Sequence, residues 1–232
     1  PNPNPIPNPN PNPDQVAYYT AGVAVVHDFS ASKEAPRNRQ RFFQSHDDDI
    51  LCMTIDPSRN YCATGQVAPL KRAQGGPCKP TVSVWDVHNM CELVQLEHEP
   101  VKDDNGVSQS MAGVQGVAFS KTGELLVTVC RDTKAHVHVW RWRKCELLCC
   151  FSGKQGLPPV VYGVVWNHRS DRQLETGNID FATYGVKHIC FWKRTVRVAL
   201  PACLPPFGPP PTTLPPFRLP PFHPPPFRSP PL

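Results

Sequence analysis

Short runs in which apolar and variable residues alternate, each ending in tryptophan, recur along the middle of the chain. They occupy residues 82–85, 137–140 and 189–192, and their tryptophans, Trp85, Trp140 and Trp192, lie 55 and 52 residues apart. Such alternation predicts β-strands. Recurrence at this interval is typical of repeat proteins, whose scaffolds mostly bind partners rather than catalyse reactions.

Between these markers the pattern predicts short strands joined by turns and contains no helical period. A hairpin over residues 16–19 and 22–27 and a short strand over 41–44 precede the repeats. The repeat strands are predicted at residues 50–55, 61–65, 81–86 and 92–98, then 114–119, 125–130, 136–140 and 146–151, and finally 160–166, 181–184 and 188–192.

Four short strands per unit are typical of the blade of a β-propeller. Residues 125–130 form a nearly continuous apolar run, which is expected where neighbouring blades cover both faces of a sheet. The sequence therefore predicts an all-β fold, a partial β-propeller of about three blades plus a partial one. A propeller closes with roughly four to eight blades, so we expect the chain to be a fragment of a longer protein.

Proline separates the two ends of the chain from this middle part. Of 30 prolines, seven lie in residues 1–13 and fifteen in residues 201–232. We expect a disordered Pro-Asn arm over residues 1–13, the partial propeller over 14–198, and a disordered tail rich in Pro-Pro-Phe over 199–232. The tail either binds an aromatic-grooved adaptor domain as a polyproline ligand or is low-complexity sequence without a folded role.

Net charge narrows the class of binding partner, and the cysteines indicate the cellular compartment. The formal net charge is +5 and the pI about 8.7, which suits a partner with an acidic surface but falls short of a dedicated nucleic-acid binder. Most of the ten cysteines lie in apolar strand-like runs without a Cys-x-x-Cys pair, which favours free thiols in a reducing cytosol. The sequence shows no signal peptide, and its apolar runs are too short to span a membrane.

Several motifs are more specific than the strand pattern. Trp85-Asp86 closes a strand as at the end of a WD40 repeat, and His46 follows Ser45 where such repeats usually carry Gly-His. With these, the segments at residues 45–50, 56–57, 63–68, 116–120 and 181–185 resemble the echinoderm microtubule-associated protein-like family. The resemblance covers roughly residues 16–194. Only one repeat keeps Trp-Asp, because Arg141 follows Trp140 and Lys193 follows Trp192.

This resemblance implies WD40-type propeller blades that bind microtubules through the propeller surface, in the cytoplasm and on the cytoskeleton, without catalysis or a cofactor. It also implies that His46 is a structural member of the hydrogen-bond network that braces each blade. A generic WD40 scaffold that binds other proteins but not tubulin is an alternative, as is an adaptor ligand acting through the tail. We expect no contact with nucleic acid or membrane.

The chemistry-bearing residues outside these motifs favour structural roles. His136-x-His138 places two imidazoles on one face of a strand, but without a third ligand in the sequence, packing between blades is favoured over a metal. Asp47-Asp48-Asp49 is more typical of a solvated turn than of a cation site. No phosphate-binding glycine loop or nucleophile elbow is present, so we expect no catalytic, cofactor-binding or metal residues.

Basic residues follow two of the tryptophans at equivalent positions. They are Arg141, Arg143 and Lys144 after Trp140, and Lys193 and Arg194 after Trp192. Because tubulin is acidic, a basic rim built from these side chains would attract it electrostatically. The alternative interpretation is that they are charged turns that only keep the loops soluble.

Overall fold

The computed structural model describes residues 8–9, 15–29, 40–69, 79–101, 106, 111–153, 160–167 and 178–195. The chain divides into two units, Pro1–Val198 and Ala199–Leu232, and the second lies wholly outside the described residues. The expectations for the Pro-Pro-Phe tail, and for most of the Pro-Asn arm, therefore concern residues that the structure does not describe.

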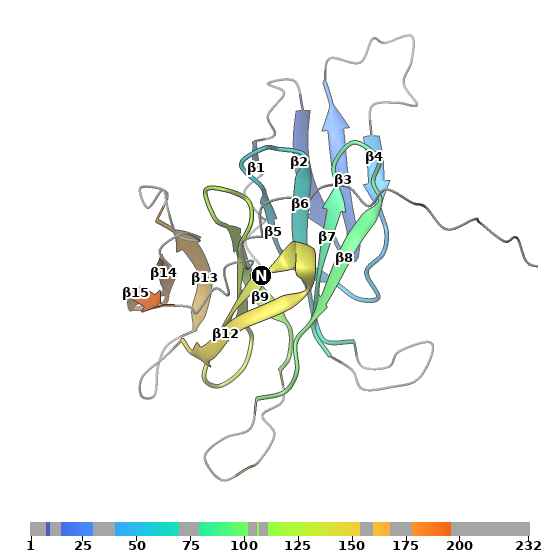
Figure 1. The fold of residues 1–232 in the computed structure, drawn as a ribbon. Helices are drawn as coiled ribbons and strands as arrows, with labels where there is room; N and C mark the ends of the chain where they lie inside the picture. Colours follow the sequence, from blue (N-terminus) through green and yellow to red (C-terminus); the bar gives the residue numbers. More distant parts are fainter. Residues whose placement is uncertain are drawn as a thin grey trace, which may run out of the picture. The chain divides into compact units, whose positions relative to one another are not determined.

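The described strands form four antiparallel sheets, one after another along the chain (Figure 1). The first contains β1 (Asn8–Pro9), β2 (Gln15–Thr20), β3 (Val23–Asp28) and β4 (Gln40–Phe43). The second contains β5 (Ile50–Ile55), β6 (Tyr61–Gln66), β7 (Thr81–Asp86) and β8 (Glu92–Glu97). The third contains β9 (Val114–Phe119), β10 (Leu126–Cys130), β11 (His136–Arg141) and β12 (Glu146–Ser152), and the fourth β13 (Val161–Trp166), β14 (Asn178–Gly185) and β15 (His188–Thr195).

In every sheet the strands pair in chain order, which is the meander of a propeller blade. The predicted all-β partial propeller is thus confirmed. The first sheet is more complete than the sequence indicated, because Asn8 and Pro9 of the proline-rich arm pair with Ala17 and Val16. Proline is tolerated in this position because β1 lies at the edge of the sheet.

The described residues contain one short helix and no long one. The 3₁₀-helix η2 (Trp142–Lys144) joins β11 to β12, where the sequence predicted only a charged turn. Its single turn buries Trp142 and turns Arg143 and Lys144 outward. Nothing helical in the described part has the length and apolar character needed to cross a bilayer.

Apolar side chains gather in three separate cores, and each core lies between two successive sheets. Every core contains one of the repeat tryptophans, together with an apolar residue from the last strand of the preceding sheet. The three pairs are Phe43 with Trp85, Leu96 with Trp140, and Phe151 with Trp192. The tryptophans therefore lie in equivalent surroundings, as a repeated blade requires.

Strand β10 shows why the apolar pattern of the third sheet is nearly continuous. Leu126 and Cys130 belong to the core shared with the second sheet, whereas Val127 and Val129 belong to the core shared with the fourth. Alternate side chains of one strand point to opposite faces, so both faces of this sheet are buried. Burial on both faces removes the polar positions that a half-exposed strand would show.

Two glycines, one from each sheet, lie at the contact between the third and fourth sheets. A Cβ atom built on Gly116 of β9 would lie 2.8 Å from the Cα atom of Gly163 in β13. Real Cβ atoms do not approach backbone so closely, and the backbone has no rotamer with which to yield. The inner strands therefore meet with main chain against main chain.

Replacing Gly116 with valine should separate β9 from β13. Overpacking of this kind costs about 1–3 kcal/mol of unfolding free energy. Denaturant titration of the full chain followed by tryptophan fluorescence would measure the loss. Glu124→Ala, an exposed substitution in the turn before β10, is the control and should leave the midpoint near the parental value. Equal midpoints for G116V and the parent would show that the two strands are not held in contact.

Candidate functional site

A hydrogen-bonded triad braces the second sheet. The Trp85 indole nitrogen donates to the Thr64 hydroxyl oxygen at 3.1 Å, and that hydroxyl lies 2.6 Å from His46 Nε2. His46 Nδ1 lies 2.6 Å from the Gln66 side-chain oxygen, which can only accept. Nδ1 therefore carries the proton, and Nε2 accepts the hydroxyl proton of Thr64. Burial lowers the pKa of His46, which keeps the ring neutral.

Triads of the same composition occur in the third and fourth sheets, although His188 of the fourth lies in β15 itself and not before the first strand of its sheet. His98 Nε2 lies 2.8 Å from the Thr128 hydroxyl, to which the Trp140 indole donates at 3.4 Å. In the fourth sheet Thr183 accepts from Trp192 at 2.9 Å and lies 3.0 Å from His188. Each threonine pairs across the strands with the residue two before the tryptophan, namely Ser83, His138 and Cys190. These three threonines were not identified from the sequence. Each can be found as the residue that pairs across the strands with the position two before a tryptophan.

The residue after each tryptophan differs in role among the sheets. The Asp86 carboxylate accepts hydrogen bonds from the backbone N–H groups of His88 and Asn89 at 2.7 and 2.9 Å and so closes the turn into β8. Arg141 occupies this position in the third sheet and forms an ion pair with Glu146 at 2.6 Å. Lys193 occupies it in the fourth sheet and is exposed.

The turns that follow the first and third strands of a sheet lie at the same end of that sheet. In the second sheet Val87 donates to the Asn60 carbonyl at 2.9 Å, and in the third the Trp142 indole donates to the Gly123 carbonyl at 2.7 Å. This end carries the basic rim of Arg141, Arg143, Lys144, Lys193 and Arg194, and Arg59 and Lys121 lie at the same end.

Aromatic rings support two of the rim arginines. The Arg143 guanidinium lies 4.2 Å from the ring centre of Trp142 and 4.7 Å from that of Tyr61, which belongs to the neighbouring sheet. The Arg194 guanidinium lies 4.5 Å from the ring centre of Phe151. Stacking fixes these side chains without neutralising them. Among the described residues Arg143, Lys144 and Lys193 form no ion pair with a carboxylate, so their charges face the solvent.

The opposite end of the sheets carries carboxylates in its turns. Asp47-Asp48-Asp49 form a bend before β5, in which the Asp49 N–H donates to the Asp48 carboxylate at 2.8 Å. Glu97 and Glu99 share Lys79 at 3.4 and 2.5 Å. Asp132 is bonded to His136 at 2.5 Å, which holds the pKa of the Asp132 carboxyl below its usual value against the opposing effect of burial. Arg143, Lys144 and Lys193 lie on the basic rim without an ion pair among the described residues, so this rim is the surface suited to an acidic partner.

These sheets, tryptophan cores and repeated triads define a segment of a WD40-type β-propeller. No protein-family model matches the chain. Over 180 residues, 77% of its length, the chain is 34% identical to echinoderm microtubule-associated protein-like 2 of Rattus norvegicus and of Mus musculus. It is 29% identical over 180 residues to echinoderm microtubule-associated protein-like 1 of Homo sapiens. The chain covers 24% of the length of the first two and 19% of the third.

The chain is thus a homologue of the echinoderm microtubule-associated protein-like proteins, and the family resemblance in its motifs is confirmed. It spans about a quarter of the length of the two rodent relatives.

Replacing Thr64 with valine should remove the centre of the first triad while keeping the side-chain shape. His46 Nε2 and the Trp85 indole would then lose their shared buried partner, at about 1–3 kcal/mol per unsatisfied group. Urea titration of the unfolding free energy would measure this cost. Thr54→Val on β5 is the matched control, because no hydrogen bond of the Thr54 hydroxyl is found within the described part of the chain. Similar losses for both variants would contradict a bracing role for the triad.

The lowered pKa of His46 should make the fold sensitive to acid. The unfolded chain binds a proton at this residue near pH 6.5, whereas the folded chain does so only at lower pH. The unfolding free energy should therefore fall as the pH drops below about 6.5. His46 alone can contribute at most about 1.4 kcal/mol per pH unit to this fall. His46→Gln should reduce the slope of unfolding free energy against pH in denaturant titrations between pH 7 and 5. An unchanged slope would exclude His46 as a contributor.

Proposed function

We propose that the chain is a non-catalytic microtubule-binding segment of the cytoskeleton in the cytoplasm, and that its basic rim contacts the acidic surface of tubulin. The observation that carries the proposal is the group of basic side chains at one end of the sheets. Aromatic rings support Arg143, and among the described residues Arg143, Lys144 and Lys193 have no carboxylate partner. The relatives are named as microtubule-associated proteins, which supports the choice of partner.

The basic rim is suited to long-range attraction rather than to a deep pocket. Its charges are spread over the turns of successive sheets, so their fields add on one side of the molecule. Arg143 and Arg194 are held by stacking, which lowers the side-chain entropy lost on binding. Because Glu146 offsets Arg141, we expect Arg141 to contribute less than its neighbours Arg143 and Lys144.

A second candidate function is a scaffold that binds other proteins without touching tubulin. The outward side chains of the fourth sheet favour it, since Phe191 is 82% exposed and Ile189 65% exposed. Exposed apolar groups of this size commonly mark a protein contact. Sedimentation with microtubules separates the two functions, because the scaffold would remain in the supernatant.

Charge reversal at the basic rim should weaken microtubule binding. The double variant Arg143→Glu/Lys144→Glu should reduce affinity roughly tenfold in a co-sedimentation titration, since each exposed charge contact is worth up to about 1 kcal/mol. Wild-type binding should also weaken as salt is raised, because surface charges are screened.

The matched control carries the same charge change at the opposite end of the third sheet, as Arg131→Glu/Lys134→Glu. It should keep most of the wild-type affinity. Equal affinities for the two double variants would remove the basic rim from the binding surface, and a wild-type chain that never co-sediments would favour the scaffold function.

A further inference from the structure

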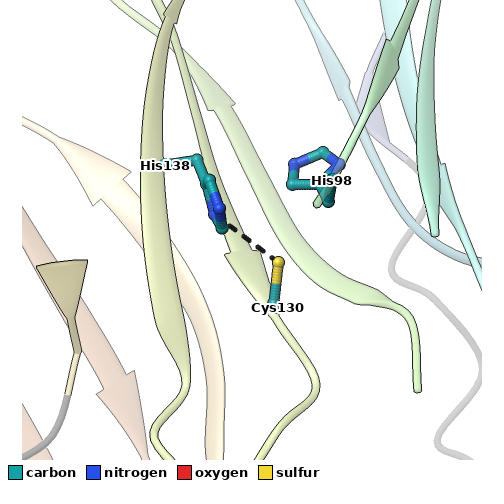
Figure 2. Close-up of side chains that lie close together, drawn as sticks. All are labelled: His98, Cys130 and His138. Atoms are coloured by element: carbon teal, nitrogen blue, oxygen red, sulfur yellow. Dashed lines mark hydrogen bonds between the residues drawn. The ribbon is translucent and has the colours of Figure 1, made fainter. Parts of the chain in front are cut away.

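Three metal-ligating side chains converge between the second and third sheets. His98 directly follows β8, Cys130 ends β10, and His138 lies in β11 (Figure 2). Each offers one ligand atom, and these atoms all lie within 4.8 Å of one another. All three residues are buried. Residues far apart in the sequence thus form a compact donor set of two imidazole nitrogens and one sulfur, away from the basic rim.

The spacing of the cluster is close to that of a coordination sphere. Cys130 Sγ lies 3.6 Å from His138 Nδ1. Two ligands at metal–sulfur and metal–nitrogen distances of about 2.3 and 2.0 Å are separated by about 3.5 Å in a tetrahedral site. The separation of Cys130 Sγ and His138 Nδ1 therefore already matches that of two ligands of one tetrahedral metal ion. A modest approach of the His98 ring, which is packed edge-on against His138 with ring centres 4.9 Å apart, would complete the set.

Neighbouring groups already orient the ligands. His138 Nε2 lies 3.3 Å from Cys150 Sγ, which leaves Nδ1 directed toward Cys130. His98 Nε2 is bonded to Thr128, while its Nδ1 has no hydrogen-bond partner within the described residues although it is fully buried. Outer contacts of this kind are typical of metal sites.

The protonation states also suit a metal. Burial lowers the pKa of His98 to about 4 and, with the nearby His98 and His136, lowers that of His138 to about 3, so both rings are neutral. Burial raises the pKa of the Cys130 thiol well above its usual value, so the metal-free cluster carries no charge. A bound cation would displace the thiol proton to solvent and form one metal–thiolate bond.

We propose that His98, Cys130 and His138 bind a thiophilic d¹⁰ cation, Zn²⁺ or Cu⁺, which links the second sheet to the third. One thiolate and two imidazoles are ligands that both ions accept. Cu⁺ would leave the buried site neutral, whereas Zn²⁺ would leave one positive charge for the nearby Asp132 to offset. The site extends beyond the microtubule proposal, since it joins two blades whatever surface they present.

The full chain, stripped with chelator and reduced with a phosphine, should take up one equivalent of Zn²⁺ or Cu⁺ under anaerobic conditions. Elemental analysis after gel filtration measures the stoichiometry, and thermal unfolding should shift to higher temperature because the metal binds the folded state. The ion with the larger shift at equal concentration is the one that the folded site binds more tightly. Failure of both ions to bind in stoichiometric amount would overturn the proposal and leave the microtubule proposal untouched.

Variants locate the bound metal. Cys130→Ala and His138→Gln should lose both the equivalent and the thermal shift. Cys62→Ala, which removes a buried thiol of the second sheet outside the cluster, and His136→Gln on the same strand as His138 are the matched controls and should retain them. Metal that persists in C130A would be adventitious, bound by exposed thiols such as Cys91 and Cys145, and would contradict the site.

X-ray absorption by the metal in the wild-type chain provides a readout that does not depend on the folding of the variants. The expected first shell contains one sulfur and two imidazole nitrogens. A shell with no sulfur, or with two or more, would overturn the assignment even if C130A fails to fold.

Discussion

Burial of both faces of the third sheet is the constraint on which the described structure depends. Its alternate side chains enter two different cores, one shared with the second sheet and one with the fourth. A sheet of this kind has no face suited to water, so it requires a neighbour on each side. The His–Thr–Trp triads recur beside these cores, where a tryptophan indole or a histidine ring would otherwise carry an unpaired buried nitrogen.

The sequence was informative wherever a local pattern determines the structure. The strands of the second and third sheets were predicted to within one or two residues, because alternation and turn composition are local signals. Strand β1 was missed because a Pro-Asn repeat has low β-propensity, and its pairing with β2 depends on contacts outside that segment. Helix η2 was missed because one turn of three residues leaves no periodic trace.

The sites show the same division between local and long-range information. The basic residues after Trp140 and Trp192 are visible in the sequence, but the stacking of Arg143 on Tyr61 joins two sheets and is not. The sequence pairs His136 with His138 on one strand, yet the two have different partners in the structure. His136 bonds to Asp132 four residues earlier, whereas His138 joins Cys130 and a histidine from the segment after the preceding sheet. Loops of unequal length between strands hide such convergence from any fixed spacing.

The glycine contact between β9 and β13 has a mechanical consequence. No side chain separates Gly116 from Gly163. The contact therefore contains no side chain that could change rotamer when the two sheets tilt. Farther out, the same interface is filled by the rings of Phe151, Phe181 and Trp192, which can slide over one another. Any change in the angle between the two sheets would therefore have to be accommodated in the aromatic layer, because the glycine contact cannot yield.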